Sequence, residues 1–142
     1  MNKDTLIAER IFDAPIEKVW GALTNLDEMK KWYFDISEFK LEIGFEFQFQ
    51  GENECKVYIH KCKILEVIQN KKLSYSWSYE DYPGNSILTF DLFKFENKTK
   101  LVITHEGLET FPQENPNFAK TSFEEGWNYI IGISLKQYLE LI

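Results

Sequence analysis

The C-terminal stretch from Ser122 to Ile142 constrains the fold more than any other part of the sequence. On a helix of about 3.6 residues per turn, its large apolar side chains fall on one arc. They are Phe123, Trp127, Ile130, Ile131, Leu135, Tyr138, Leu141 and Ile142. A stripe this wide and aromatic cannot face water, so we expect the helix to pack against a large concave surface. The rest of the chain must supply that surface.

Small and polar residues mark the start and the middle of this predicted helix. Thr121 and Ser122 are each followed three residues later by a glutamate, Glu124 and Glu125, which predicts two overlapping capping boxes. Ser134 lies in the middle of the apolar stripe. Its hydroxyl either bonds a backbone carbonyl or borders a void that faces the sheet and contacts a ligand. The sequence leaves these two alternatives open.

The segments upstream alternate between strand and helix patterns. Leu6–Phe12 alternates in the manner of a first strand. Pro15 is suited to the first turn of a short helix, and the sequence Thr24-Asn25 interrupts that helical pattern. A second short helix is predicted up to Trp32. Two short helices therefore follow one strand.

The remaining patterns have a period of two residues and predict strands. These strands run from Phe45 to Phe49, Cys55 to Ile68, Leu73 to Tyr79, Ile87 to Phe95 and Lys100 to His105. In the second of them the apolar residues change parity, which predicts a bulge or strong coiling of the strand near Lys61. The polar breaks between strands are short, which favours antiparallel hairpins. Only residues 107–118 form a long irregular link, and that link leads into the terminal helix.

This order predicts an α+β helix-grip fold. Its parts are a curled antiparallel sheet of about seven strands, two short helices after the first strand, and a long C-terminal helix packed on the concave face. We expect a single domain that covers residues 1–142.

Charge and hydropathy disfavour several classes of function. The chain has 23 acidic and 16 basic residues and a net charge of −7, whereas nucleic acids and anionic membranes require a basic face. No stretch approaches the roughly 18 apolar residues of a membrane span, and no signal-peptide pattern is present. Cys55 and Cys62 are seven residues apart, which fits neither a disulfide framework nor a zinc site. We expect a cytoplasmic protein, monomeric or weakly dimeric, that binds no nucleic acid and spans no membrane.

No local motif predicts catalysis, a metal site or a cofactor. His105 and Glu106 point to opposite faces of one strand, and His60 has no partner at metal-ligand spacing. The hydrolase, zincin and nucleotide-binding motifs are missing. A site assembled from scattered Tyr and His residues and Arg10, as in a cofactor-free cyclase or hydrolase, remains an alternative.

Short motifs in order along the chain resemble the family of proteins similar to the activator of heat-shock-protein-90 ATPase (AHSA-like), within the START-like (SRPBCC) superfamily. They are Glu9–Pro15, Val19-Trp20, Leu23-Thr24, Lys31–Tyr33, Ile43–Phe45 with Phe47, Ile64–Val67, Lys72-Leu73 with Tyr75 and Trp77, Thr104–Leu108, and Gly126-Trp127. The resemblance implies an apolar cavity between sheet and helix. The superfamily includes lipid and hormone binders, polyketide cyclases and co-chaperones. Eukaryotic activators add an N-terminal domain for full stimulation, whereas this chain begins directly with its first strand.

Aromatic residues on positions that can face inward are candidates for the wall of such a cavity. The predicted ligand-binding residues are Phe47, Phe49, Tyr75, Trp77, Tyr79, Trp127, Ile131, Ser134 and Tyr138. Two alternatives stay open: these rings form a filled core, or the row of Tyr75, Trp77 and Tyr79 faces outward as a partner site.

The sequence supports three functional hypotheses. The first is a non-enzymatic domain that holds a small apolar or aromatic molecule between sheet and helix. The second is a protein-interaction module that acts on a chaperone ATPase, as the family resemblance implies. The third is the cofactor-free cyclase or hydrolase.

Overall fold

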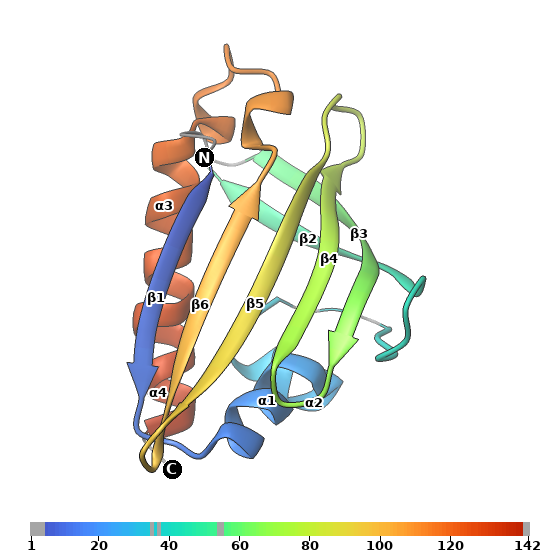
Figure 1. The fold of residues 1–142 in the computed structure, drawn as a ribbon. Helices are drawn as coiled ribbons and strands as arrows, with labels where there is room; N and C mark the ends of the chain where they lie inside the picture. The colour runs from blue at the N-terminus through green and yellow to red at the C-terminus, as the bar shows by residue number, and fades with distance from the viewer. Residues whose placement is uncertain (1–4, 35, 37, 54–55, 141–142) are drawn as a thin grey trace.

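The computed structural model describes residues 5–34, 36, 38–53 and 56–140, and it shows a six-stranded sheet curled around a C-terminal helix (Figure 1). The strands are β1 (Leu6–Phe12), β2 (Glu46–Asn53), β3 (Lys56–Ile68), β4 (Lys72–Tyr79), β5 (Ser86–Phe95) and β6 (Lys98–Glu106). Their order in the sheet is β1-β6-β5-β4-β3-β2, and every neighbouring pair is antiparallel. The predicted helix-grip fold is confirmed.

The sheet has six strands rather than about seven, one for each alternating segment found in the sequence, and the long apolar run forms only one of them. β3 stays continuous from Lys56 to Ile68, and its pairing with β4 shifts register between Ile64 and Glu66. The bulge predicted near Lys61 is therefore at Leu65. Cys62 and Ile64 precede the bulge and share the concave face with Trp77 and Tyr75, their partners on β4. The extra residue at Leu65 brings Val67 to the core side, opposite Leu73.

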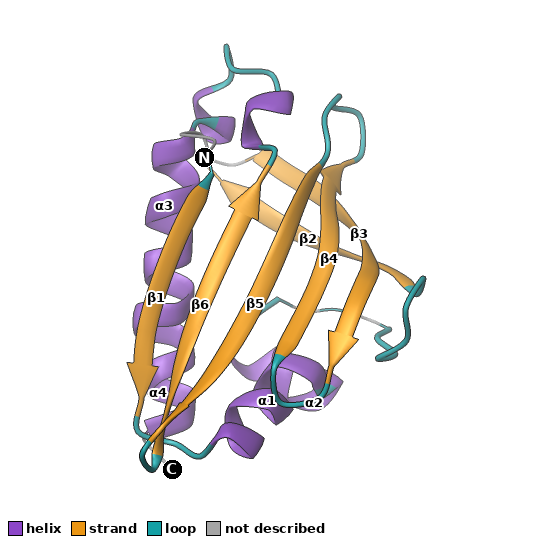
Figure 2. Ribbon diagram, in the orientation of Figure 1, coloured by secondary structure: helices purple, strands orange, loops and turns teal. Residues whose placement is uncertain are grey.

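The helices cover one face and one end of the sheet (Figure 2). The two short helices are α1 (Ile16–Thr24) and α2 (Leu26–Trp32). The side chain of Asn25 caps α2 by accepting a hydrogen bond from the backbone N–H of Glu28. The link after β6 holds two single turns, η1 (Leu108–Thr110) and η2 (Pro116–Phe118). No helix among the described residues is long and apolar enough to cross a membrane.

The terminal helix has three segments, α-helical at both ends and π-helical in the middle. These are α3 (Lys120–Tyr129), a π-helical segment η3 (Ile130–Leu135) and α4 (Lys136–Glu140). Its most buried side chains are spaced four residues apart: Phe123, Trp127, Ile131, Leu135 and Leu139. In an α-helix each step of four residues drifts about 40° around the axis, so five such residues would leave one face. The wider π segment, with i→i+5 bonds, keeps them facing the sheet.

The wider winding corrects two details of the predicted stripe. Leu139 is buried in the place expected for Tyr138, which is half-buried, as is Ile130. Leu141 and Ile142 lie outside the described residues. The apolar arc itself is confirmed. A helix with 3.6 residues per turn and a helix with a wider turn place the same residues on one face for several turns before they diverge.

The predicted capping boxes are wrong. The helix begins earlier, at Lys120, with Ala119 at its N-cap and no side-chain cap. Ser122 instead donates its hydroxyl to the carbonyl of Pro116, at 2.8 Å. That bond ties the first turn of α3 to η2, so the long link before the helix is fastened to the helix start.

Candidate binding site

A cavity of about 460 Å³ lies between α3 and the concave face of β2, β3 and β4. Its lining residues come from four parts of the fold. They are Phe34 after α2; Gly51, Tyr58, His60, Trp77 and Tyr79 on the sheet; Pro116, Asn117 and Phe118 in η2; and Ser122, Phe123, Glu125, Gly126, Trp127 and Ile130 on the terminal helix. The wall is predominantly aromatic, as is usual for sites that bind small molecules.

One edge of the terminal helix forms a wall of this cavity. Ser122, Gly126 and Ile130 recur every four residues and so lie above one another on that edge. A Cβ atom added at Gly126 would meet no other heavy atom within 4 Å. The glycine therefore leaves open space on the cavity side of the helix, where a larger residue would fill it.

The opposite wall is centred on His60 of β3. Its ring stacks on Phe49, with ring centroids 4.6 Å apart, and meets the edge of Trp77 at 4.9 Å. Its Nδ1 lies 3.1 Å from the carbonyl oxygen of Tyr58. Burial lowers the pKa of His60 to about 4, so the imidazole is neutral at neutral pH. The wall carries a polar ring with no charge.

Gly51 leaves room for the His60 ring. A Cβ at position 51 would lie 2.6 Å from Cε1 of His60, closer than real Cβ contacts come. The ring cannot easily move away, because it is buried and stacked on Phe49. We expect Gly51→Ala to lower the free energy of unfolding by about 1–3 kcal/mol through overpacking.

Chemical denaturation checks this expectation, with Gly126→Ala as the matched control. That change adds the same methyl group to another cavity-lining glycine, but in open space and inside a helix. It should raise the free energy of unfolding by up to about 1 kcal/mol. Equal effects of the two substitutions would contradict the crowding argument.

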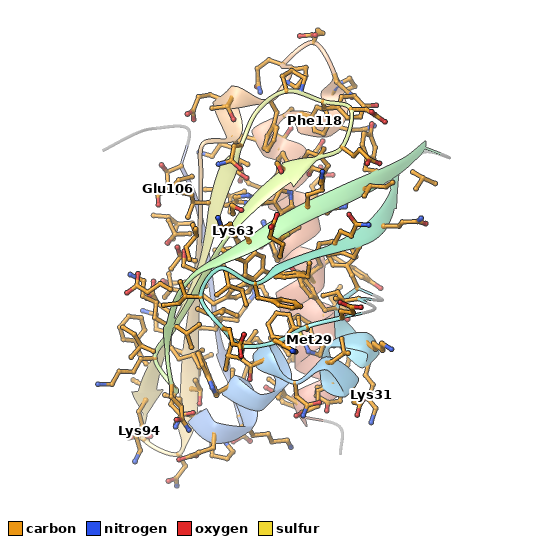
Figure 3. All side chains as sticks on the ribbon, turned by 90° about the vertical axis from the view of Figure 1, so that its right-hand side faces the viewer. Met29, Lys31, Lys63, Lys94, Glu106 and Phe118 are labelled. Carbon is orange, nitrogen blue, oxygen red and sulfur yellow. The ribbon has the colours of Figure 1, made fainter. Side chains whose placement is uncertain are left out.

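The end of the cavity is closed by η2. Asn115 and Asn117 each donate a side-chain N–H to the hydroxyl oxygen of Tyr58, at 3.3 and 2.8 Å. The ring of Phe118 packs on Tyr58 and Tyr79, with centroids 5.5 and 4.8 Å away. Figure 3 shows Phe118 toward the opposite end of the molecule from Met29 of α2. The link before the terminal helix thus forms part of the wall.

A chain of hydrogen bonds joins the terminal helix to the sheet behind the cavity. Trp127 donates its indole N–H to Nδ1 of His105 at 3.1 Å, and Nε2 of His105 lies 2.8 Å from Oγ of Ser86. Indole is only a donor, so Nδ1 must be the acceptor and Nε2 carries the proton. Ser86 in turn donates to the carbonyl of Trp77 at 2.8 Å. Each polar group in the chain has a partner.

His105 is fully buried, and burial lowers its pKa to about 3. Both of its ring nitrogens are engaged, so it holds the helix in place and is not exposed to the cavity. Glu106, next to it, is exposed on the other face of the sheet, as predicted from strand alternation. Arg10 is also outside the cavity, on β1, where it donates to Oδ1 of Asn128 at 2.9 Å. Of the two histidines and Arg10 considered for a cyclase, only His60 lines the cavity, together with the tyrosines Tyr58 and Tyr79.

The structure places the predicted site residues in three groups. Trp77, Tyr79 and Trp127 line the cavity. Phe49 lies directly behind His60. The other five are buried or engaged elsewhere: Phe47, Tyr75, Ile131, Ser134 and Tyr138.

Polar side chains of the third group are held by contacts within the protein. Ser134 donates to the carbonyl of Trp32 at 2.5 Å, so its hydroxyl joins the terminal helix to α2. Tyr138 donates to Glu28 at 2.8 Å. The Tyr75 hydroxyl lies 2.8 Å from that of Tyr33, and burial raises the pKa of both. These groups stabilise the core beside the cavity.

The row of Tyr75, Trp77 and Tyr79 is buried on the concave face. It does not form the outward aromatic stripe considered as a partner site. The serines that alternate with these rings take the other face, as their spacing predicts. Cys62 is a free, buried thiol, while Cys55 lies outside the described residues. No group of three or more His, Cys, Asp or Glu side chains in the described part of the chain could hold a metal ion.

Most of the lining residues were not among the predicted ligand contacts, including Phe34, Tyr58, His60 and Glu125. The apolar residues of β3 before Lys61 have odd numbers, so the alternation favoured the face of Val57 and Ile59. The structure exposes Val57 and turns Tyr58 and His60 inward, where His60 lies opposite Phe49 on β2 and Tyr79 on β4. Phe34 lies in a loop and Glu125 at the edge of the helical stripe, where no periodicity could identify them.

A curled antiparallel sheet that grips a C-terminal helix, with a cavity between them, defines the helix-grip class of proteins. The chain belongs to the family described as Activator of Hsp90 ATPase homolog 1-like protein, whose family model matches residues 13–140. This confirms the family resemblance of the sequence motifs. A comparison with the curated proteins finds no match.

Several solved structures share the fold. Protein CV1439 from Chromobacterium violaceum has a TM-score of 0.83 and 20% identity, covering 98% of this chain and 99% of that chain. Protein MLL2253 from Mesorhizobium loti has a TM-score of 0.78 and 28% identity, covering 96% of each chain. DynU16, from the dynemicin biosynthetic locus, has a TM-score of 0.79 and 18% identity, covering 98% of this chain and 48% of that chain.

Proposed function

We propose that this protein binds a small apolar or aromatic molecule in the cavity between α3 and the sheet. The observation that carries the proposal is the cavity itself, about 460 Å³ with a mainly aromatic wall. Sites for small molecules commonly have volumes of about 300–1,000 Å³ and combine apolar walls with a few polar groups. A core that was simply filled would leave no space of this size.

Ligand binding without catalysis is the function that the residues of the cavity support best. A cyclase or hydrolase requires at least two titratable groups that converge on the substrate. His105 and Arg10 lie outside the cavity, and both nitrogens of His105 are engaged. His60 lines the cavity, but its pKa of about 4 makes it a weak base at neutral pH. Burial raises the pKa of the Tyr79 hydroxyl, and the Glu125 carboxylate lies exposed at the border of the cavity.

The binding proposal is tested by filling the cavity from the helix. We expect Gly126→Leu to weaken binding of an apolar aromatic probe at least about tenfold, because its side chain occupies the open space beside Gly126. The measurement is a thermal-shift and native mass spectrometry screen with lipids and aromatic metabolites. A binding ligand raises the melting temperature by mass action.

Gly126→Ala is the control, because it adds one methyl group and leaves most of the space free. It should bind as the unmodified protein does. If no member of the library shifts the melting temperature of the unmodified protein, the binding proposal is rejected. If Gly126→Leu binds as well as Gly126→Ala, the ligand occupies another place.

Family membership supports a second proposal, that the protein stimulates a chaperone ATPase. The direct assay adds the purified protein to a chaperone of the heat-shock-protein-90 type and measures ATP hydrolysis. An unchanged rate over a wide range of protein concentration would remove this proposal.

A further inference from the structure

The charged groups of the cavity wall restrict the charge of its ligand. Among the described residues that line the cavity, Glu125 is the only charged side chain at neutral pH, since none of them is Lys or Arg and His60 is neutral there. Glu125 is exposed on α3, at the border of the cavity. Within the described residues, no ion pair or hydrogen bond joins its carboxylate to another side chain. A ligand can therefore use this carboxylate without displacing a protein partner.

The hydrogen-bond donors of the wall are mostly engaged within the protein. The indole N–H of Trp77 donates to the Tyr79 hydroxyl at 2.9 Å, and that of Trp127 donates to His105. The Ser122 hydroxyl donates to Pro116. The hydroxyl protons of the wall tyrosines are left as neutral donors. An anionic ligand would lose its hydration in this cavity and find no cation to replace it.

The same bonds affect the ring faces. An aromatic ring has a negative face and a positive edge. The indole N–H groups, which lie at ring edges, point at protein acceptors. A cation is attracted to the faces of indole and phenol rings, and the attraction is stronger the more the cation is desolvated. Aromatic faces beside an unpaired carboxylate therefore favour positive charge.

We propose that the ligand carries a protonated amine on its apolar or aromatic body, with the ammonium group held between Glu125 and the aromatic wall. This inference rests on the proposed binding function and adds the charge of the ligand to it. The net charge of −7 acts in the same direction, because it raises the local concentration of cations near the surface.

Three probes with one ring system and different charge test the inference. They are naphthylmethylamine, which is cationic at neutral pH, naphthylmethanol, which is neutral, and naphthylacetate, which is anionic. Isothermal titration calorimetry at low and high salt gives the three affinities. We expect the amine to bind about tenfold more tightly than the alcohol at low salt, and the acetate to bind most weakly. Added salt should reduce the preference for the amine.

Glu125→Gln keeps the shape of the side chain and removes its charge. We expect it to reduce the preference of the amine over the alcohol to about threefold or less, with the affinity of the alcohol unchanged. Glu124→Gln is the matched control, since Glu124 is exposed on the same turn but does not line the cavity. It should keep the preference. Both residues are exposed, so both variants should fold normally.

The outcomes separate this inference from the binding proposal. If none of the probes binds and the wider ligand screen is also negative, the binding proposal fails. If the alcohol binds as tightly as the amine, or the acetate binds best, the binding proposal stands and the amine inference is overturned. The inference is also overturned if Glu125→Gln and Glu124→Gln change the preference equally, because the carboxylate at the cavity would then have no special part.

Discussion

Replacing Trp127 with alanine is expected to lower the free energy of unfolding by about 3–5 kcal/mol, a large share of the roughly 5–15 kcal/mol typical of a domain. The indole is almost fully buried although it borders the cavity, and it contacts Trp77, with ring centroids 5.7 Å apart, and Phe90, at 6.2 Å. Its removal also leaves Nδ1 of His105 without a donor, and an unpaired buried group adds about 1–3 kcal/mol. Urea denaturation followed by circular dichroism measures the loss.

Two further variants separate packing from hydrogen bonding at this position. Trp127→Phe keeps much of the ring and loses the N–H, so we expect a smaller loss of about 1–3 kcal/mol. Tyr129→Ala, on the exposed side of the same helix, should stay within about 0.5 kcal/mol of the original protein. A loss for Trp127→Ala no greater than that for Tyr129→Ala would show that the helix is not held through Trp127.

Acidification below neutral pH is expected to destabilise the fold through its two buried histidines. The pKa of His105 falls from an ordinary 6.5 to about 3 in the folded state, and that of His60 falls to about 4. Each is neutral when folded and takes up a proton when unfolded, so the unfolded state binds more protons below pH 6.5. Their stabilising contribution is complete above that pH and is lost as the pH falls toward the folded values. Each histidine should remove about 1.4 kcal/mol per pH unit within this window.

Between neutral pH and about pH 5, the two histidines together should lower the free energy of unfolding by about 3–4 kcal/mol. Urea denaturation across this range measures the slope. His60→Phe removes one titrating group and keeps an aromatic ring, so the slope should fall to about half. The lowered pKa of the Glu140 carboxyl, which follows from its hydrogen bond to Lys136, acts below its ordinary 4.5 and so outside this range. A free energy of unfolding that stays constant from neutral pH to about pH 5 would contradict the proposed neutral state of both histidines.

Much of the fold follows from the sequence because strand alternation and helical periodicity are local signals. The alternation of Tyr75, Trp77 and Tyr79 with serines predicts the buried face of β4 without tertiary information. The position of the bulge is less accessible, because Leu65 and Lys61 both permit a parity change and only the pairing with β4 selects one. The predicted start of α3 is wrong for a similar reason. Ser122 donates a hydrogen bond to the carbonyl of Pro116, a contact that local capping rules do not contain.

The site could be predicted only in part. Trp77, Tyr79 and Trp127 follow from periodicity, since residues that face a cavity share the pattern of residues that face a core. For the same reason Tyr75 and Ile131 were included although neither lines the cavity. Whether an inward position meets a neighbour or open space depends on how far the sheet and the helix are apart, which no local pattern encodes. Gly126 illustrates this, because the open space beside it is visible only in three dimensions.

The change of winding in the terminal helix has a mechanical consequence. Ile130, a wall residue, is the first residue of the wide segment, directly after the last residue of α3. A shift of the α-to-π junction by one backbone hydrogen bond would rotate Ile130 relative to a bound ligand, while both ends of the helix stay packed on the sheet. The end of the α-helical winding thus coincides with the wall of the cavity, so the length of the π-helical segment sets the shape of that wall at Ile130.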